Sequence, residues 1–235
     1  MTEPRRTELR ANLATVRHRI EVACAAAGRD PHGVSLVAVT KTWPASDVRL
    51  LAELGVTDVG ENRDQEARPK HVACADLGLR WHFVGRLQRN KSGSVATYAD
   101  VVHSVDRQPL VTALDRAAGD AGRVVTALIQ VSLDATAGPA RGGARPDLVD
   151  DLAAQVAAAG SLRLGGVMAV APLDADPDTA FARLAEVAAR LRDSHPEAVA
   201  ISAGMSGDLE PAVRHGATHL RIGTALLGHR ESPVR

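Results

Sequence analysis

The apolar positions of this chain alternate between helical spacing and short apolar runs. Residues 8–27 place leucine, valine and isoleucine at helical spacing and end before Gly28, which predicts an amphipathic entry helix. Residues 34–40 form a short run rich in valine, which is typical of a strand, and residues 44–54 return to a helical pattern that ends before Gly55. The chain therefore begins with a helix, followed by a strand–helix unit.

The same strand–helix unit recurs along the whole sequence. Strands are predicted at residues 34–40, 57–60, 81–85, 101–105, 124–131, 162–168, 198–202 and 219–223. Further helices are predicted at residues 62–71, 87–97, 107–118, 146–159, 176–194 and 208–215. Strict alternation requires parallel strands with right-handed crossovers, and eight such units in 235 residues favour a closed barrel over an open sheet. We therefore expect an α/β protein, a (β/α)8 TIM barrel with an extra N-terminal helix, forming a single domain over residues 1–235.

The charges exclude several classes of partner. Lys and Arg together number 28, as do Asp and Glu, so no net field attracts nucleic acid or an anionic membrane. The charged N-terminus has no apolar segment, and no run approaches the roughly 18 apolar residues of a membrane span. Cys24 and Cys74 have no paired spacing, which suits a reducing compartment. These features predict a cytoplasmic protein with no nucleic-acid or membrane partner.

Two small groups of residues have the composition of a polyanion site and of a metal site. Arg86, Arg89 and Lys91 are basic, but three charges at the start of one predicted helix are typical of a solvated face. His71 and Cys74 have the spacing of a metal-binding pair on a helix, yet the sequence offers no third or fourth ligand. We therefore predict neither a polyanion site nor a metal site.

A lysine stands where a barrel of this kind carries its functional groups, which is at the C-terminal ends of the strands. Lys41 follows the first predicted strand, whose apolar residues lie on one side of it, so we expect its amine to be partly desolvated. Desolvation favours the neutral amine, which attacks an aldehyde to form an imine. A lysine that extends from the strand end into solvent is the alternative.

Small residues follow the seventh and eighth predicted strands. Residues 204–210 read GMSGDLE and lead into a helix, while residues 221–228 contain Gly223, which permits close backbone approach, and Thr224, which adds a hydroxyl. Unpaired amides at a helix start bind phosphate, and the loops after strands 7 and 8 often carry it in such barrels. Taken singly, Ser206 is also typical of a helix cap and Gly223 of an ordinary turn. Together the two loops predict a phosphate site.

Five segments, in this order, resemble the family of pyridoxal phosphate homeostasis proteins, relatives of the barrel domain of alanine racemase. They are VAVTKTWP at 37–44, GENRDQE at 60–66, WHFVGRLQRNK at 81–91, GMSGDLE at 204–210 and RIGT at 221–224. The resemblance spans nearly the whole chain and implies a fold-type III barrel that binds pyridoxal 5′-phosphate. It departs from the family pattern at Thr40, where serine is common, at Arg86, where proline is common, and at Arg141, in a stretch that frequently contains lysine.

The resemblance also implies roles for individual residues. Lys41 forms the Schiff base, and Arg221 faces the nitrogen of the pyridine ring. Ser206, Gly223 and Thr224 hold the phosphate, while Asn62 and His82 line the pocket. For Arg221 a structural salt bridge is the alternative role. A guanidinium stays protonated, so beside the ring nitrogen it favours the unprotonated ring, which is a weaker electron sink, and carbanion chemistry is restrained.

Two functions use the same Schiff base: an amino-acid racemase and a protein that carries or buffers the cofactor. Racemisation needs acid–base groups on both faces of the substrate carbon, and in alanine racemases the resemblance implies that one comes from a further domain that this chain lacks. Tyr98 precedes the fourth predicted strand, so we expect a packing residue at the opposite end of the barrel. A small racemase would have to use Lys41 and His82.

We therefore expect intracellular pyridoxal phosphate homeostasis without dedicated catalytic residues, with the small racemase as the alternative. The expected partners are pyridoxal phosphate itself and apo forms of pyridoxal-dependent enzymes. The family resemblance further suggests a monomer, since the additional domain of the racemases is missing.

Overall fold

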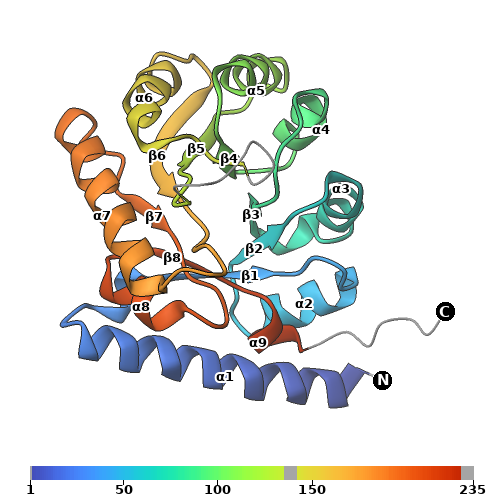
Figure 1. Ribbon diagram of the computed structural model, residues 1–235. Coiled ribbons are helices and arrows are strands. Elements are labelled where there is room, and N and C mark those ends of the chain that lie inside the picture. Colours follow the sequence, from blue (N-terminus) through green and yellow to red (C-terminus); the bar gives the residue numbers. More distant parts are fainter. Residues whose placement is uncertain (1, 135–141, 229–235) are drawn as a thin grey trace.

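A computed structural model describes residues 2–134 and 142–228, and its strands form a closed barrel (Figure 1). The strands are β1 Ser35–Val39, β2 Asp58–Glu61, β3 Arg80–Phe83, β4 Val101–Val105, β5 Val125–Gln130, β6 Leu162–Met168, β7 Ala200–Ser202 and β8 His219–Ile222. Each pairs in parallel with the next, and β8 pairs in parallel with β1. The predicted (β/α)8 barrel is confirmed. Arg141 lies outside the described residues.

Helices surround the strands. They are α1 Thr2–Ala26, α2 Ala45–Glu53, α3 Asp64–Ala73, α4 Ser92–Ala96, α5 Gln108–Asp120, α6 Val149–Ala157, α7 Pro177–Ser194, α8 Leu209–Arg214 and α9 Thr224–Leu227. The prediction of one long helix at 87–97 was wrong, because a single 3-10 turn at Arg89–Lys91 precedes the short α4. The short α9 was not predicted. Within the described ranges, no helix is both long and apolar enough to cross a membrane.

The entry helix α1 packs against the outside of the barrel, beside α8 and α9 (Figure 1). Leu9, Leu13, Val16 and Ile20 are buried at intervals of three and four residues, so they form one apolar stripe that joins the main core. Burying such a side chain typically stabilises a fold by about 1.5–3 kcal/mol. The predicted extra helix is therefore an integral part of the structure.

Polar side chains of α1 also hold the loops that follow β7 and β8. Arg19 forms a bidentate ion pair with Glu210 at 2.9 and 3.0 Å, and its Nη1 donates to the carbonyl oxygen of Ser206 at 3.0 Å. Asn12 Nδ2 donates to the carbonyl oxygen of Leu226 at 3.0 Å, near the end of α9. Bidentate arginine pairs fix geometry as well as energy. The entry helix thus sets the position of both predicted phosphate loops.

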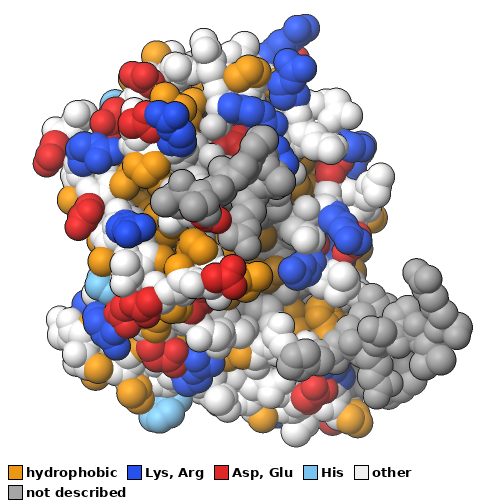
Figure 2. All heavy atoms as spheres, viewed as in Figure 1, with side chains coloured by type: hydrophobic (Ala, Val, Ile, Leu, Met, Phe, Trp, Pro, Cys, Tyr) orange, Lys and Arg blue, Asp and Glu red, His pale blue; other side chains and the backbone are white. Residues whose placement is uncertain are grey.

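The surface carries charges of both signs. On the face drawn in Figure 2, Lys and Arg side chains occur together with Asp and Glu, and apolar side chains lie between them. Many arginines make ion pairs, such as Arg49 with Asp76 at 2.7 Å. Exposed pairs of this kind contribute about 0–1 kcal/mol each, so they tune the surface more than they stabilise the fold.

Candidate functional site

The predicted imine lysine and the predicted phosphate turn meet at the same edge of the barrel. Strands β1 and β8 are neighbours, and Ala38 pairs with Ile222. An ideal Cβ at Gly223 would lie 3.4 Å from the carbonyl oxygen of Val39, so the turn after β8 passes close to the end of β1. Lys41 follows two residues later. The closed barrel therefore brings together two segments from opposite ends of the chain.

Lys41 is exposed and makes no hydrogen bond or ion pair with the described residues. The expectation of a partly desolvated amine was wrong, because β1 ends at Val39 and Lys41 lies in the turn beyond the barrel wall. Thr42 in this turn has a φ of 68°, which is unusual for a β-branched residue. Its amide donates to Glu66 Oε2 at 2.8 Å, so α3 holds the turn. Such strained residues cluster at functional sites.

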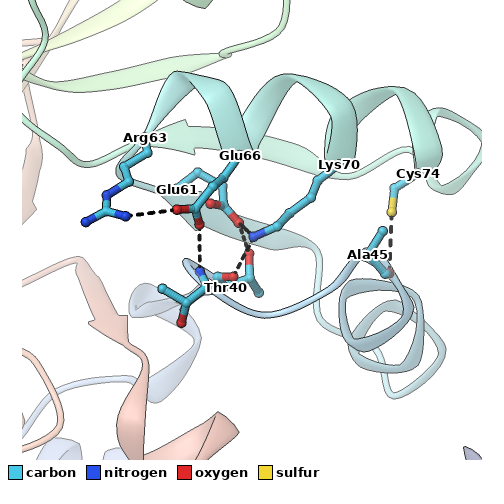
Figure 3. Close-up of polar contacts among 8 residues, drawn as sticks. Thr40, Ala45, Glu61, Arg63, Glu66, Lys70 and Cys74 are labelled. Carbon is cyan, nitrogen blue, oxygen red and sulfur yellow. Dashed lines mark hydrogen bonds and ion pairs between the residues drawn. The ribbon is translucent and has the colours of Figure 1, made fainter. Parts of the chain in front are cut away.

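A buried ion pair lies next to this turn (Figure 3). Lys70 Nζ donates to Glu61 Oε1 at 2.7 Å and to the carbonyl oxygen of Thr40 at 2.8 Å, while the Thr40 hydroxyl donates to Glu61 Oε1 at 2.7 Å. Glu61 is fully buried. Burial raises the pKa of Glu61, and the hydrogen bonds from Lys70 and Thr40 only partly offset this effect. The cluster ties the residue before Lys41 to the end of β2.

The two predicted phosphate loops are joined by a hydrogen bond. The amide of Ala225 donates to Ser206 Oγ at 3.1 Å, and among the described residues the Ser206 hydroxyl donates to none. No side chain of the described part of the chain caps the amides at the start of the short α8, as expected, while Asp208 Oδ1 accepts from the loop amide of Met205 at 2.6 Å. Thr224 is exposed at the start of α9. Hydroxyls and backbone amides of both loops therefore converge.

Arg221 is buried, with 5% of its surface exposed. Its Nη1 donates to Ser202 Oγ at 2.6 Å and its Nη2 to the carbonyl oxygen of Ala169 at 2.8 Å. Burial lowers the pKa of Arg221 to about 10, so the guanidinium is still charged at neutral pH. No carboxylate of the described residues forms an ion pair with it, so the alternative of a structural salt bridge is wrong. The charge of Asp208 offsets part of the cost of burying this cation without an ion pair, and the remaining cost calls for a functional explanation.

Asn62 and His82 lie in different surroundings. Asn62 follows β2, and its Oδ1 is buried with no hydrogen-bond partner among the described residues. His82, in β3, is 1% exposed and lies within hydrogen-bond distance of Asp58 and of His103. A direct contact of either residue with a cofactor stays a prediction. His103 was not identified from the sequence, although a histidine in the buried run Val-Val-His-Ser-Val was a usable signal.

Tyr98 is a packing residue, as predicted. It is 2% exposed and precedes β4, its hydroxyl donates to Asp64 Oδ1 at 3.4 Å, and its ring lies against His71. Burial raises the pKa of Tyr98. The Tyr98 hydroxyl therefore reaches the first residue of α3, which follows the C-terminal end of β2, so the expected location at the opposite end of the barrel holds for its backbone and not for its hydroxyl.

A cavity of about 650 Å³ opens beside the loop after β7. Its lining includes Met205, Gly207 and Asp208, together with residues that follow β5 and β6. Lys41 and Arg221 lie outside this lining. The cavity therefore adjoins the loop after β7 and lies near the ends of β5, β6 and β7.

Comparison with known proteins assigns this barrel, with its lysine after the first strand, to a known class. The family model for the N-terminal domain of alanine racemase matches residues 11–231. Alanine racemase of Clostridium difficile 630 shares the fold with a TM-score of 0.69 at 15% identity, covering 97% of this chain and 61% of that chain. The chain belongs to this family of barrels.

Closer relatives narrow the class further. The pyridoxal phosphate homeostasis protein of Mycobacterium bovis is 46% identical over 245 residues, covering 96% of this chain and 94% of the relative. The protein of the same name from Escherichia coli K12 is 37% identical over 230 residues, covering 94% and 96%. The structure of PipY from Synechococcus elongatus PCC7942 with PLP bound has a TM-score of 0.81 at 34% identity, covering 94% of this chain and all of that one. The chain belongs to the pyridoxal phosphate homeostasis protein family.

Proposed function

We propose that this protein binds pyridoxal 5′-phosphate through Lys41 and carries or buffers it inside the cell. The observation that carries the proposal is the meeting of Lys41 with the Gly223 turn at one strand edge, with Arg221 two residues before that turn. When bound, the group supplies an aldehyde for a lysine amine and an electron-withdrawing ring. Lys41, Ser206, Gly223, Thr224 and Arg221 would hold its aldehyde, phosphate and ring nitrogen.

The residues present fit this group. Lys41 has no competing partner among the described residues, and the Ser206 hydroxyl has an unused hydrogen. A guanidinium has five N–H groups, and the described residues accept from only two nitrogens of Arg221. The buried Oδ1 of Asn62, which has no hydrogen-bond partner among the described residues, adds a further polar atom directly after β2. Each of these groups has a free donor or acceptor for a polar ligand.

Carriage is favoured over racemisation by the surroundings of the second base. A second proton donor must reach the face of the substrate opposite Lys41. Tyr98 is buried and its hydroxyl donates to Asp64, and both ring nitrogens of His82 already lie within hydrogen-bond distance of protein atoms. Arg221 remains charged at neutral pH and cannot take a proton from the ring. Carriage requires none of these steps.

The wider setting is also a proposal. One hydrophobic cluster extends from Leu9 to Leu227, which supports a single domain for residues 1–235. Large exposed apolar side chains are mostly scattered over separate elements, which suits a monomer. The buried free thiols of Cys24 and Cys74 suit a cytoplasmic location. We propose apo pyridoxal-dependent enzymes as recipients, because the exposed Lys41 lies where another protein has access to it.

Borohydride trapping tests the attachment site. Purified protein is loaded with pyridoxal phosphate, reduced with borohydride and mapped by peptide mass. We expect a visible absorption band and one labelled peptide, with Lys41 as the modified residue. Lys41→Ala should lose both while keeping the circular dichroism of the wild type. A Lys41→Ala protein that keeps the band, with the label on another lysine, would disprove the assignment.

A transfer assay separates carrier from enzyme. Loaded protein is mixed with an apo pyridoxal enzyme, and recovery of that enzyme's activity is followed. Deuterium exchange at the α-carbon of a panel of amino acids is measured in parallel. We expect transfer without substantial exchange, because general acid–base groups contribute about 10²–10⁴-fold each and the part of the chain that the structure describes places no second one opposite Lys41. Rapid exchange that is lost in both Lys41→Ala and His82→Ala would make this protein a racemase.

A further inference from the structure

A chain of hydrogen bonds crosses the interior of the barrel and ends at Arg221. His103 Nδ1 lies 2.9 Å from Ser202 Oγ, which accepts from Arg221 Nη1 at 2.6 Å. His103 Nε2 lies 2.8 Å from His82 Nδ1, and His82 Nε2 lies 2.9 Å from Asp58 Oδ1. His103 is on β4 and Ser202 on β7, which are not neighbours. Their contact therefore runs through the barrel interior.

The interior of such a barrel is normally filled by branched apolar side chains. Here Val101 and Ala200, which share the faces of His103 and Ser202, join only Leu128 and Met168 in a small apolar cluster separate from the main core. His103 and Ser202 are fully buried. Burying polar groups costs free energy that a packed apolar core would not incur, so the presence of these hydrogen-bonded side chains in the barrel interior calls for an explanation.

The residues at the two ends of this hydrogen-bond chain, Asp58 and Arg221, fix the direction of every hydrogen bond between them. Asp58 is a carboxylate that can only accept, and Arg221 can only donate. With neutral rings, His82 must then carry its proton on Nε2 and accept from His103 through Nδ1. His103 must likewise carry its proton on Nε2 and accept from the Ser202 hydroxyl through Nδ1. The Ser202 oxygen accepts from Arg221, so one direction satisfies the whole chain.

Electrostatics support a neutral His103. Burial, reinforced by the charge of Arg221, holds the pKa of His103 well below its usual value. Burial works to raise the pKa of Asp58, but hydrogen bonds from His82 and Thr57 hold it below its usual value. Asp58 is thus an anion at one end and Arg221 a cation at the other, and the hydrogen-bonded side chains between them connect the two charges.

We propose that His103 and His82 are positioning residues that act through Ser202 to hold Arg221 against the ring nitrogen of the bound cofactor. The proposal rests on the proposed function, because it concerns the same site. The polarised Ser202 hydroxyl fixes one edge of the guanidinium, and the Ala169 carbonyl fixes the other. The remaining N–H groups then keep one orientation. His82 therefore serves the cofactor from inside the barrel rather than as an acid or base.

Two substitutions at one position separate positioning from packing. His103→Gln keeps an acceptor and a donor in similar places, whereas His103→Leu fills a similar volume without either. We expect His103→Leu to weaken binding of pyridoxal phosphate about tenfold, as for the loss of one good hydrogen bond, and to shift the visible band. His103→Gln should restore both. A folded His103→Leu protein with wild-type affinity and band would overturn the proposal.

Nitrogen NMR of the cofactor-free wild type provides a test that needs neither ligand nor variant. Long-range ¹⁵N–¹H spectra at neutral pH should show His82 and His103 as neutral rings protonated on Nε2. A proton on Nδ1 of either ring would overturn the proposed direction, even if His103→Leu fails to fold. If the wild type does not bind pyridoxal phosphate at Lys41, the proposed function fails, whereas the direction of the chain is still decided by the spectra.

Discussion

The two halves of the barrel mouth differ in how firmly their residues are held. The exposed half contains Lys41, which has no partner among the described residues, and Thr224, at the start of α9. The buried half contains Arg221, which is 5% exposed and donates to two protein oxygens. A carrier needs a reactive amine that can take up and release its load. It also needs a fixed partner for the ring, and under the proposed function these tasks fall to different halves.

Two lysines near the same strand ends show the same contrast. Lys41 is exposed, whereas Lys70 is 8% exposed and bonded to Glu61 and to the Thr40 carbonyl. A lysine held as the cation of a buried ion pair is not available as a nucleophile. Lys70 thus supports the turn that carries Lys41 without competing with it. The difference between the two lysines lies in their hydrogen bonds, not in their distance along the chain.

The largest predicted stability effect comes from separating the buried pair. Lys70→Met should lower the free energy of unfolding by about 3–5 kcal/mol, because Glu61 is left buried without its cation. Lys41→Ala, the matched control, should change it by less than about 0.5 kcal/mol, as for an exposed residue. Urea unfolding of the cofactor-free proteins measures both. Equal stability losses in the two variants would remove the contrast between these lysines.

A double variant sharpens this prediction. Glu61→Gln combined with Lys70→Met removes both charges, so it should recover part of the stability that Lys70→Met loses. The amide oxygen of the introduced glutamine can still accept from the Thr40 hydroxyl. If the double variant is as unstable as Lys70→Met, the loss reflects packing around Lys70 and not an unpaired charge.

The barrel was predictable because its evidence is local and repeated. Eight apolar runs alternate with helical patterns, and parallel strands in such a chain close in only a few ways. The long helix predicted at 87–97 was wrong in its first half, where Gln88 is extended and the 3-10 turn Arg89–Lys91 precedes α4. The exposure of Lys41 was only the alternative interpretation, because sequence does not show where the strand stops relative to the barrel wall.

The interior hydrogen-bond chain could not be predicted for a different reason. All five residues of β4 are buried, so the run has no alternation to show which side chains face inward. The contact of His103 with Ser202 joins residues 99 positions apart on strands that are not neighbours. Only the closed geometry sets this contact. Lys41 and the phosphate loops, in contrast, lie at strand ends, where position along the sequence already indicates position in space.

A smaller effect on the free energy of unfolding should appear as the pH falls, because the buried half contains a further histidine. His219 lies beside His82 and His103, with ring centroids 6.1 and 6.5 Å away. Burial lowers the pKa of His219 to about 4. Below about pH 6.5 the unfolded chain therefore gains a proton that the folded chain does not, so stability falls as the pH falls from about 6.5 to 4. The loss attributable to this group is roughly 3 kcal/mol at the acid end.

The comparison of wild type with His219→Asn isolates this contribution. Urea unfolding is measured at neutral pH and near pH 5, and we expect the loss of stability toward acid to be smaller in the variant. The exposed His18, whose side chain is 76% exposed, offers the matched control as His18→Asn. Equal acid sensitivity of wild type and His219→Asn would show that the buried half does not depend on a neutral ring at this position.

The smallest effect concerns the exposed half, where single contacts should be removable without harm to the fold. Ser206→Ala should weaken binding of pyridoxal phosphate about threefold to tenfold, the usual worth of one hydrogen bond, because the variant loses a hydroxyl donor and the acceptor of the Ala225 amide. Binding of pyridoxal, which lacks the phosphate, should not change. Titration of both compounds gives the ratio of their affinities, and Thr112→Val on α5 is the control, because its exposed hydroxyl bonds only within its own helix. If Ser206→Ala lowers the affinity for both compounds equally, the loop supports the fold of the mouth and the phosphate lies elsewhere. A lower ratio in Ser206→Ala alone would assign the phosphate to the loops that α1 holds in place.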